Sequence, residues 1–236
     1  MCNGSTTDFG SVCIGSNPVG TTRSMISATR AIVLNHLRYG DNSLIVNLYT
    51  ESMGRQAVFV KGTFSKKSAM RLALFQPLHL VETDLYHRAN RQMQRVSNIH
   101  ICYPFQSIPF NPVKNSIALF IAEVLHKTLK EEESNPELFC FLFHTIQALD
   151  LNDCGTANFH LVFLVHYSRH LGFYLKYDHL FPQLFEMSFE NLDSLQINHH
   201  QRNTLTECLL EYYSIHVANF GKLKSFSVLR NIFQDK

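Results

Sequence analysis

The stretch that decides the fold runs from Ala28 to Thr50 and has the sequence ATRAIVLNHLRYGDNSLIVNLYT. Two runs of β-branched and apolar residues, Ala28 to Leu37 and Ser43 to Thr50, flank the turn residues Tyr39-Gly40-Asp41-Asn42. This pattern is typical of a β-hairpin. The second run carries its apolar residues at every other position, Leu44, Val46 and Leu48. That spacing predicts a strand with one buried face.

The signals for short strands continue toward residue 103. Further strand-like runs extend from Gln56 to Lys61, from Leu78 to Tyr86 and from Met93 to Tyr103. Five short strands in succession favour a small closed barrel, because closure removes exposed strand edges. We therefore predict a five-stranded barrel domain over residues 25–103.

From Pro104 onward the apolar residues recur with a helical period. The pairs Asn111-Pro112 and Asn135-Pro136 are typical helix openings, with Asn as the cap and Pro at the first position. The pattern also predicts a buried helix over about 157–171, a helix that ends at Gly221 and a last one from Ser225 to Phe233, whereas residues 174–203 show no clear pattern. The chain is thus predicted to be α+β, with an all-helical domain over residues 104–236.

The first 24 residues are rich in Gly, Ser, Thr and Asn, and they have neither a basic start nor the apolar run of a secretory signal. We expect a disordered leader over 1–24, with Met25 as the natural start. No stretch has the length and apolarity of a membrane span, and the six cysteines are widely scattered. These features favour a cytoplasmic protein with reduced thiols and no membrane partner.

The two halves of the chain differ in charge. Residues 25–102 contain ten Lys or Arg and four Asp or Glu, a net charge of +6, whereas residues 103–236 contain ten and fourteen, a net charge of −4. A basic half joined to an acidic half suggests that a polyanion binds the barrel.

The candidate residues for contacts with a polyanion lie on the barrel. A basic, serine-containing loop follows the third strand, a second basic cluster precedes and enters the fifth, and one Arg begins the third. These residues are Arg55, Lys61, Ser65, Lys66, Lys67, Ser68, Arg71, Arg88, Arg91 and Arg95. Cations and hydroxyl groups of this kind contact phosphates, although an ordinary solvated loop can have the same composition. Nearby aromatic residues could stack on bases or belong to the core: Tyr39, Tyr49, Phe59, Phe64 and Tyr86.

Catalytic and metal motifs are missing from the sequence. His166 and His170 have the spacing of metal ligands on a helix, but neither the Glu of an HExxH motif nor a clear third ligand accompanies them. Hydrogen-bonded core imidazoles explain them more simply. The sequence has no CxxC pair, no P-loop and no serine nucleophile elbow. We expect no catalytic residue, no metal and no cofactor.

The ordered set of motifs resembles the RecO family of bacterial recombination mediators. The resemblance extends from about residue 28 to 233. Its anchors are Tyr39-Gly40-Asp41, Thr50-Glu51, Gly54, Lys61-Gly62, Lys66-Lys67-Ser68, Leu171-Gly172-Phe173 and Leu223-Lys224-Ser225.

The resemblance implies a non-enzymatic DNA repair protein with an OB-fold barrel that binds single- and double-stranded DNA and anneals complementary strands. It implies cooperation with RecR, and in some lineages RecF, to place RecA on strands coated by single-strand-binding protein. The acidic tail of that protein is expected to bind the helical half, with Lys114, Lys127 and Arg169 as candidates. Many relatives carry a four-cysteine zinc module after the Leu-Gly-Phe motif. Between residues 174 and 220 this chain contains only Cys208, so zinc is not expected.

Two other classes of protein remain open. A general OB-fold nucleic-acid module, including one directed to RNA, would show the same basic barrel without the mediator's partners. A histidine-dependent metal hydrolase would use His166 and His170.

Overall fold

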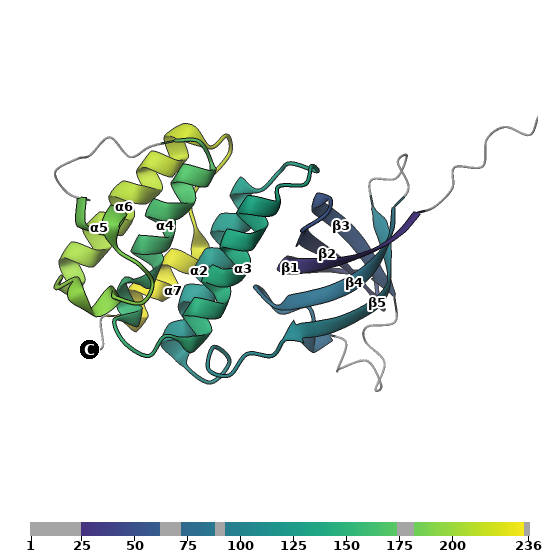
Figure 1. Cartoon of the computed structure of the whole chain (residues 1–236), viewed down its shortest axis with the longest axis horizontal. Helices are drawn as coiled ribbons and strands as arrows, with labels where there is room; N and C mark the ends of the chain where they lie inside the picture. Colours follow the sequence, from purple (N-terminus) through teal and green to yellow (C-terminus); the bar gives the residue numbers. More distant parts are fainter. Residues whose placement is uncertain (1–24, 62–71, 88–92, 174–181, 234–236) are drawn as a thin grey trace, which may run out of the picture.

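A computed structural model describes residues 25–61, 72–87, 93–173 and 182–233. These residues form a β-barrel and a bundle of helices that lie side by side along the long axis of the molecule (Figure 1). The order of barrel first and helices second confirms the predicted α+β class. The predicted leader, residues 1–24, lies outside the described residues.

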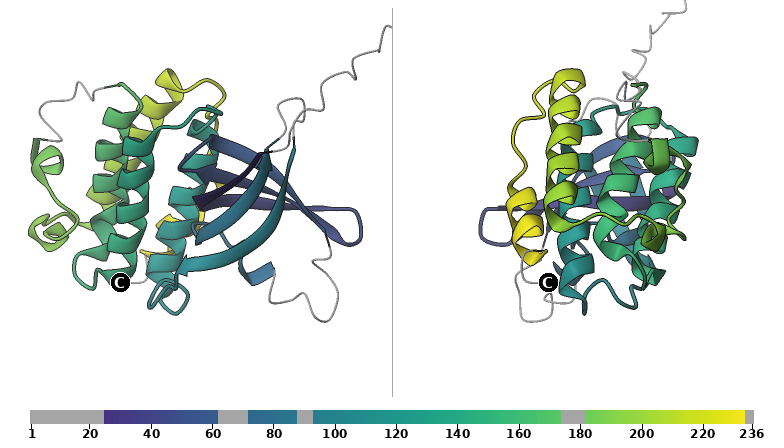
Figure 2. Two further views of the ribbon diagram at one scale, coloured as in Figure 1. Left: turned by 45° about the vertical axis from the view of Figure 1, so that its right-hand side comes forward. Right: turned by 90° about the vertical axis from the view of Figure 1, so that its left-hand side faces the viewer.

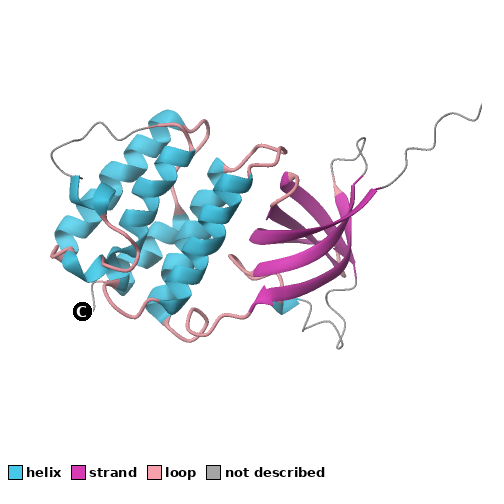
Figure 3. Cartoon of the chain, in the orientation of Figure 1, coloured by secondary structure: helices cyan, strands magenta, loops and turns pink. Residues whose placement is uncertain are grey.

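The barrel contains five strands: β1 (Met25–Tyr39), β2 (Ser43–Thr50), β3 (Gly54–Lys61), β4 (Leu80–His87) and β5 (Gln94–Tyr103). They close in the order β1-β2-β3-β5-β4, and neighbours are antiparallel except β3 and β5, which are parallel. This is the arrangement of an OB-fold barrel (Figure 3). The fourth strand begins two residues later than predicted, because Leu78 has a φ of 63° and leaves the extended conformation.

The long strand β1 closes the barrel. Its first part pairs with β4 and its second part with β2, and the pairing shifts between Val33 and Asn35. A bulge of this kind bends a strand and increases its twist. The interior contains the alternate residues predicted from the second strand, together with residues of the other strands and Phe75: Ala31, Val33, Leu44, Val46, Leu48, Val58, Phe75, Val81 and Leu85.

The helical region contains α2 (Pro112–Thr128), α3 (Pro136–Leu151), α4 (Phe159–His170), α5 (Pro182–Glu186), α6 (His199–His216) and α7 (Lys224–Ile232), with 3-10 turns at Thr156–Asn158 and Leu192–Ser194. Asn111 and Asn135 cap α2 and α3 as predicted, since their side chains accept hydrogen bonds from backbone N–H groups of the first turn. None of the described helices is long and apolar enough to cross a membrane.

The boundaries of α6 differ from the prediction. The helix begins at His199, where Asn198 and Gln201 form a reciprocal capping box. It ends at His216, so the prediction that it continues to Gly221 was wrong. Val217 adopts an extended backbone, and the chain then turns so that the buried ring of Phe220 packs on Tyr213 at 5.6 Å between centroids.

The largest hydrophobic cluster joins the barrel to the helices. It contains Ile32, Tyr49 and Leu80 from the strands as well as the buried residues of α2, α3 and α4. The Tyr49 ring lies 6.2 Å from that of Phe139 on α3. Both α2 and α3 lie between the barrel and the remaining helices (Figures 1 and 2). As predicted, α4 is buried on nearly all sides.

Candidate nucleic-acid interface

Strand register creates a row of apolar residues on the outer face of the barrel. Leu37 on β1 lies opposite Ile45 on β2, and Ile45 lies opposite Phe59 on β3. Phe59 in turn pairs with Arg95 on β5. Residues that face one another across strands project to the same side of a sheet. Their neighbours Leu44, Val46 and Val58 fill the interior, so this row faces outward.

A second row lies beside the first, toward the end of the barrel. Tyr39 pairs with Ser43, and Ser43 with Lys61. The Tyr39 ring contacts Phe59 edge to face, with 5.8 Å between centroids. Leu37 is 57% exposed and Tyr39 is 56% exposed. We call the two rows together, Leu37, Tyr39, Ser43, Ile45, Phe59, Lys61 and Arg95, the barrel face.

The two cations of the barrel face are exposed. They also line a groove of about 610 Å³ between β3 and β5, together with Phe59, Phe75 and residues 96–100. Among the described residues, β3 and β5 pair at Val58 with Gln94 and at Phe59 with Arg95, beside the groove. No described residue forms a side-chain hydrogen bond or ion pair with Lys61 or Arg95, which leaves both charges available to a ligand's phosphates.

Apart from Arg55, the predicted phosphate-contacting residues fall into two groups. Lys61 and Arg95, distant in sequence, lie on one groove. Ser65, Lys66, Lys67, Ser68, Arg71, Arg88 and Arg91 lie outside the described residues, in segments 62–71 and 88–92. Those segments begin after Lys61 and after His87, the last residues of β3 and β4.

Arg55 has a different environment from the rest of the predicted set. Its Nη1 donates to the main-chain carbonyls of His126 at 3.0 Å and Leu129 at 2.6 Å, and Nη2 lies 3.3 Å from Nδ1 of His126. Burial lowers the pKa of Arg55, and burial, followed by the charge of Arg55, lowers the pKa of His126. Arg55 therefore joins the barrel to the end of α2 and does not belong to the barrel face.

The predicted partner-binding residues are engaged within the helical region. Lys114 is 1% exposed. The ammonium group of Lys127 donates to the carbonyls of Phe220 and Lys222 at 2.7 and 2.8 Å. Arg169 is exposed and lies over the ring of Phe185 at 5.1 Å. Phe120 and Leu125, which lie between Lys114 and Lys127 on α2, are completely buried. Arg169 is therefore the member of this set that remains accessible.

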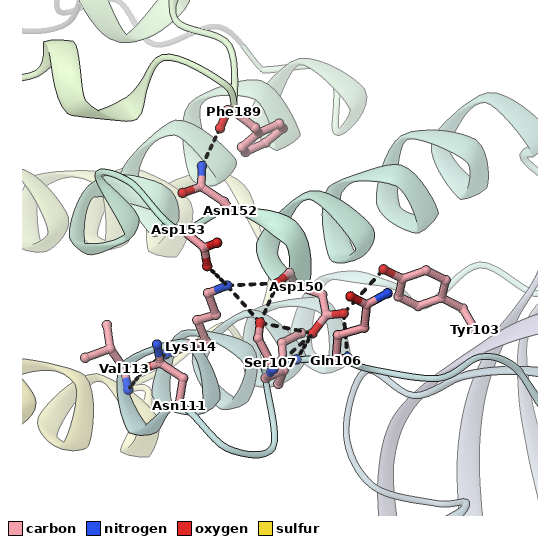
Figure 4. A network of polar contacts seen from close by, with 11 residues as sticks. Tyr103, Gln106, Ser107, Asn111, Val113, Lys114, Asp150, Asn152, Asp153 and Phe189 are labelled. Carbon is pink, nitrogen blue, oxygen red and sulfur yellow. Dashed lines mark hydrogen bonds and ion pairs between the residues drawn. The ribbon is translucent and has the colours of Figure 1, made fainter.

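The sequence did not reveal the polar network around Asp150, which anchors the segment between the barrel and α2 (Figure 4). The Asp150 carboxylate accepts hydrogen bonds from the backbone N–H groups of Gln106, Ser107 and Ile108 at 2.8 to 2.9 Å. Lys114 donates to Ser107 Oγ and to the Asp150 carbonyl, both at 2.8 Å. Burial raises the pKa of Asp150, but the N–H donors outweigh it and hold the pKa below its usual value. The sequence signal for this network was Asp150 itself, a carboxylate within the apolar run of α3.

The histidines of α4 have structural partners. His166 Nε2 lies 2.8 Å from the carbonyl oxygen of Met187, and the ring of His170 lies 4.4 Å from that of Phe141. This confirms the interpretation of His166 as a hydrogen-bonded imidazole. Within residues 25–61, 72–87, 93–173 and 182–233, no three His, Cys, Asp or Glu side chains are placed to hold a metal ion.

Comparison with known proteins finds similarity along most of the chain. The family model for the N terminal of Recombination protein O matches residues 25–105, and the model for its C terminal matches residues 109–180. The DNA repair protein RecO of Phocaeicola vulgatus is 35% identical, in an alignment that covers 89% of this chain and 100% of the relative. The DNA repair protein RecO of Bacteroides fragilis is 36% identical, in an alignment that covers 89% of this chain and 100% of the relative. The DNA repair protein RecO of Flavobacterium psychrophilum is 33% identical, in an alignment that covers 87% of this chain and 98% of the relative. With two family models matched in order and relatives similar along almost their entire length, the chain belongs to the Recombination protein O (RecO) family.

Proposed function

We propose that this protein is a DNA repair and recombination mediator. In this role it binds single- and double-stranded DNA, anneals complementary strands and, with RecR, helps to load RecA onto strands coated by single-strand-binding protein. RecF is a further partner that we propose. Family membership and the relatives' name, DNA repair protein, support the general role.

The observation that carries the proposal is the composition of the barrel face. Tyr39 and Phe59 offer aromatic rings in mutual contact. Lys61 lies two residues further along β3 from Phe59, and Arg95 pairs with Phe59 from β5. Stacking of a base on such a ring contributes about 1–3 kcal/mol. The cations neutralise phosphates and release counterions.

The barrel face suits a protein that must accept any sequence. Its rings contact the faces of bases and its cations contact phosphates, and neither contact depends on base identity. The predicted residues of segments 62–71 and 88–92 extend this set, with Ser65, Lys66, Lys67, Ser68, Arg71, Arg88 and Arg91 as proposed backbone ligands. Annealing requires such tolerance, because both complementary strands must bind.

The mediator role needs neither a catalytic residue nor a cofactor, because strand exchange between partners breaks no covalent bond. We propose a cytoplasmic location, where DNA, RecR and single-strand-binding protein are present. For the acidic tail of single-strand-binding protein, Arg169 is the candidate that remains exposed. Lys114 and Lys127 are not included in this proposal, because their ammonium groups donate to main-chain carbonyls within the protein.

The test compares DNA with RNA on the full chain. Fluorescence anisotropy would measure binding of matched single-stranded DNA and RNA oligonucleotides, and a fluorescence-transfer assay would follow annealing of complementary DNA strands. The proposal predicts binding of DNA and acceleration of annealing. Binding of RNA alone, or DNA binding without annealing, would favour a general nucleic-acid module instead.

A further inference from the structure

A second groove, about 910 Å³ in volume, lies in the helical region between α3 and the segment that follows α5. One wall comes from one face of α3, with residues spaced by three or four, and from the C-cap residue Asn152: Phe141, His144, Thr145, Ala148, Leu151 and Asn152. The opposite wall comprises Ser188, Phe189 and Glu190. We call this feature the α3 groove.

The α3 groove is held open by fixed contacts. The Asn152 amide donates to the carbonyl oxygen of Phe189 at 2.7 Å and so ties the two walls together (Figure 4). The Phe189 ring stacks on Phe159 of the core at 4.7 Å. Leu151, the last residue of α3, is 59% exposed beside this wall. The groove therefore presents a preformed apolar surface to solvent.

The rim of the α3 groove is negative. Asp153 and Glu190 line it, and the described residues of its lining include no Lys or Arg. The Asp153 side chain is 89% exposed, and Glu190 is exposed. The cation beside Asp153 is the buried Lys114, 3.3 Å away, whose ammonium also donates to Ser107 and to the Asp150 carbonyl. The outer side of the Asp153 carboxylate stays open to a second cation.

We propose that the α3 groove binds an amphipathic helix of a partner protein that carries Lys or Arg beside its apolar residues. The lining of α3 from Phe141 to Leu151 covers about three helical turns, which matches a short helix laid alongside it. Apolar side chains would pack against Leu151 and Phe189, and cations would meet Asp153 and Glu190. An acidic peptide is disfavoured here, since local charges dominate over those beyond about 8 Å at physiological salt. This proposal does not depend on the barrel face.

The test is peptide display against the full chain. Random peptides of about 15 residues, long enough for three to four turns, are selected on the wild-type protein and counter-selected on a Leu151→Asp/Glu190→Lys variant. Both residues are exposed, so the variant should keep its helical circular dichroism and its melting temperature. We expect enriched peptides with apolar residues at helical spacing and an excess of Lys or Arg.

An enriched peptide is then labelled and titrated. Its Kd should rise about tenfold with Leu151→Ser or Glu190→Lys, as for a central anchor or a rim charge of an interface, and should rise with salt. Leu119→Ser and Glu211→Lys, which change exposed residues away from the groove, should leave it unchanged. Enrichment of acidic peptides, equal loss of affinity in the control variants, or failure to enrich any groove-dependent peptide would overturn the proposal.

Discussion

The guanidinium group of Arg55 on β3 donates a 2.6 Å hydrogen bond to the main-chain carbonyl of Leu129, the C-cap residue of α2. The same nitrogen donates to the carbonyl of His126 at 3.0 Å. A helix end leaves such carbonyls without partners inside the helix. One barrel side chain thus satisfies the end of the helix that packs against the barrel.

Replacing Arg55 by Ala should destabilise the protein by about 2 kcal/mol, because hydrogen bonds to a charged group are lost and two part-buried carbonyls lose their partner. Urea denaturation followed by circular dichroism would measure the change. Arg95→Ala is the matched control and should change stability little, since Arg95 is exposed. Equal stability of the two variants would contradict the role given to Arg55.

Removing both cations of the barrel face should weaken binding of single-stranded DNA and reduce its dependence on salt. Each lost phosphate contact lowers the slope of log K against log salt by about 0.7 for single strands. For the Lys61→Ala/Arg95→Ala variant, the slope should therefore be smaller in magnitude by about 1.4. Anisotropy titrations at several salt concentrations would measure it. An unchanged slope would indicate that other residues contact the phosphates, with Lys66 and Lys67 as the first candidates.

The aromatic pair of the barrel face can be tested separately from its charge. Tyr39→Ala or Phe59→Leu should weaken binding of single strands by about 1–3 kcal/mol if a base stacks there, with the salt slope unchanged. Phe110→Ala is the control, because Phe110 is 82% exposed and lies before α2, away from the barrel face. A loss of affinity shared by Phe110→Ala would argue against stacking at this position.

The lowered pKa of Asp150 predicts a specific pH dependence of stability. Its folded-state pKa lies below the unfolded value of about 3.8, so its contribution is fully present above that value and is lost as pH falls through the folded pKa. The wild type should exceed Asp150→Asn in free energy of unfolding at pH 7, and the gap should shrink in acid. A gap that stays constant from pH 7 to pH 3 would show that the carboxylate charge is not responsible.

The strands and most helices could be predicted because their periods are local. Alternation in Ser43–Thr50 and the caps Asn111 and Asn135 act over a few residues, and the structure confirms them. The start of α6 could also have been predicted, since Asn198 and Gln201 have the spacing of a capping box.

The roles of individual cations could not be predicted in this way. Arg55 and Lys114 resemble surface cations in sequence, but each meets carbonyls far along the chain, at His126 and Leu129 or at Asp150. Such partners are set by the packing of barrel against helices, which a local pattern does not contain. The register that aligns Leu37, Ile45 and Phe59 was likewise fixed only by strand pairing.

The central claim, that this chain is a mediator acting through its barrel face, is tested most directly by annealing of DNA strands that are already coated with the cognate single-strand-binding protein. Fluorescence transfer between labelled complementary strands would report the rate for the wild type and for the Tyr39→Ala/Arg95→Ala variant. We predict that the wild type anneals the coated strands and that the variant is much slower, while the two proteins have similar melting temperatures. Failure of the wild type to anneal coated strands, or equal rates for both proteins, would contradict the account.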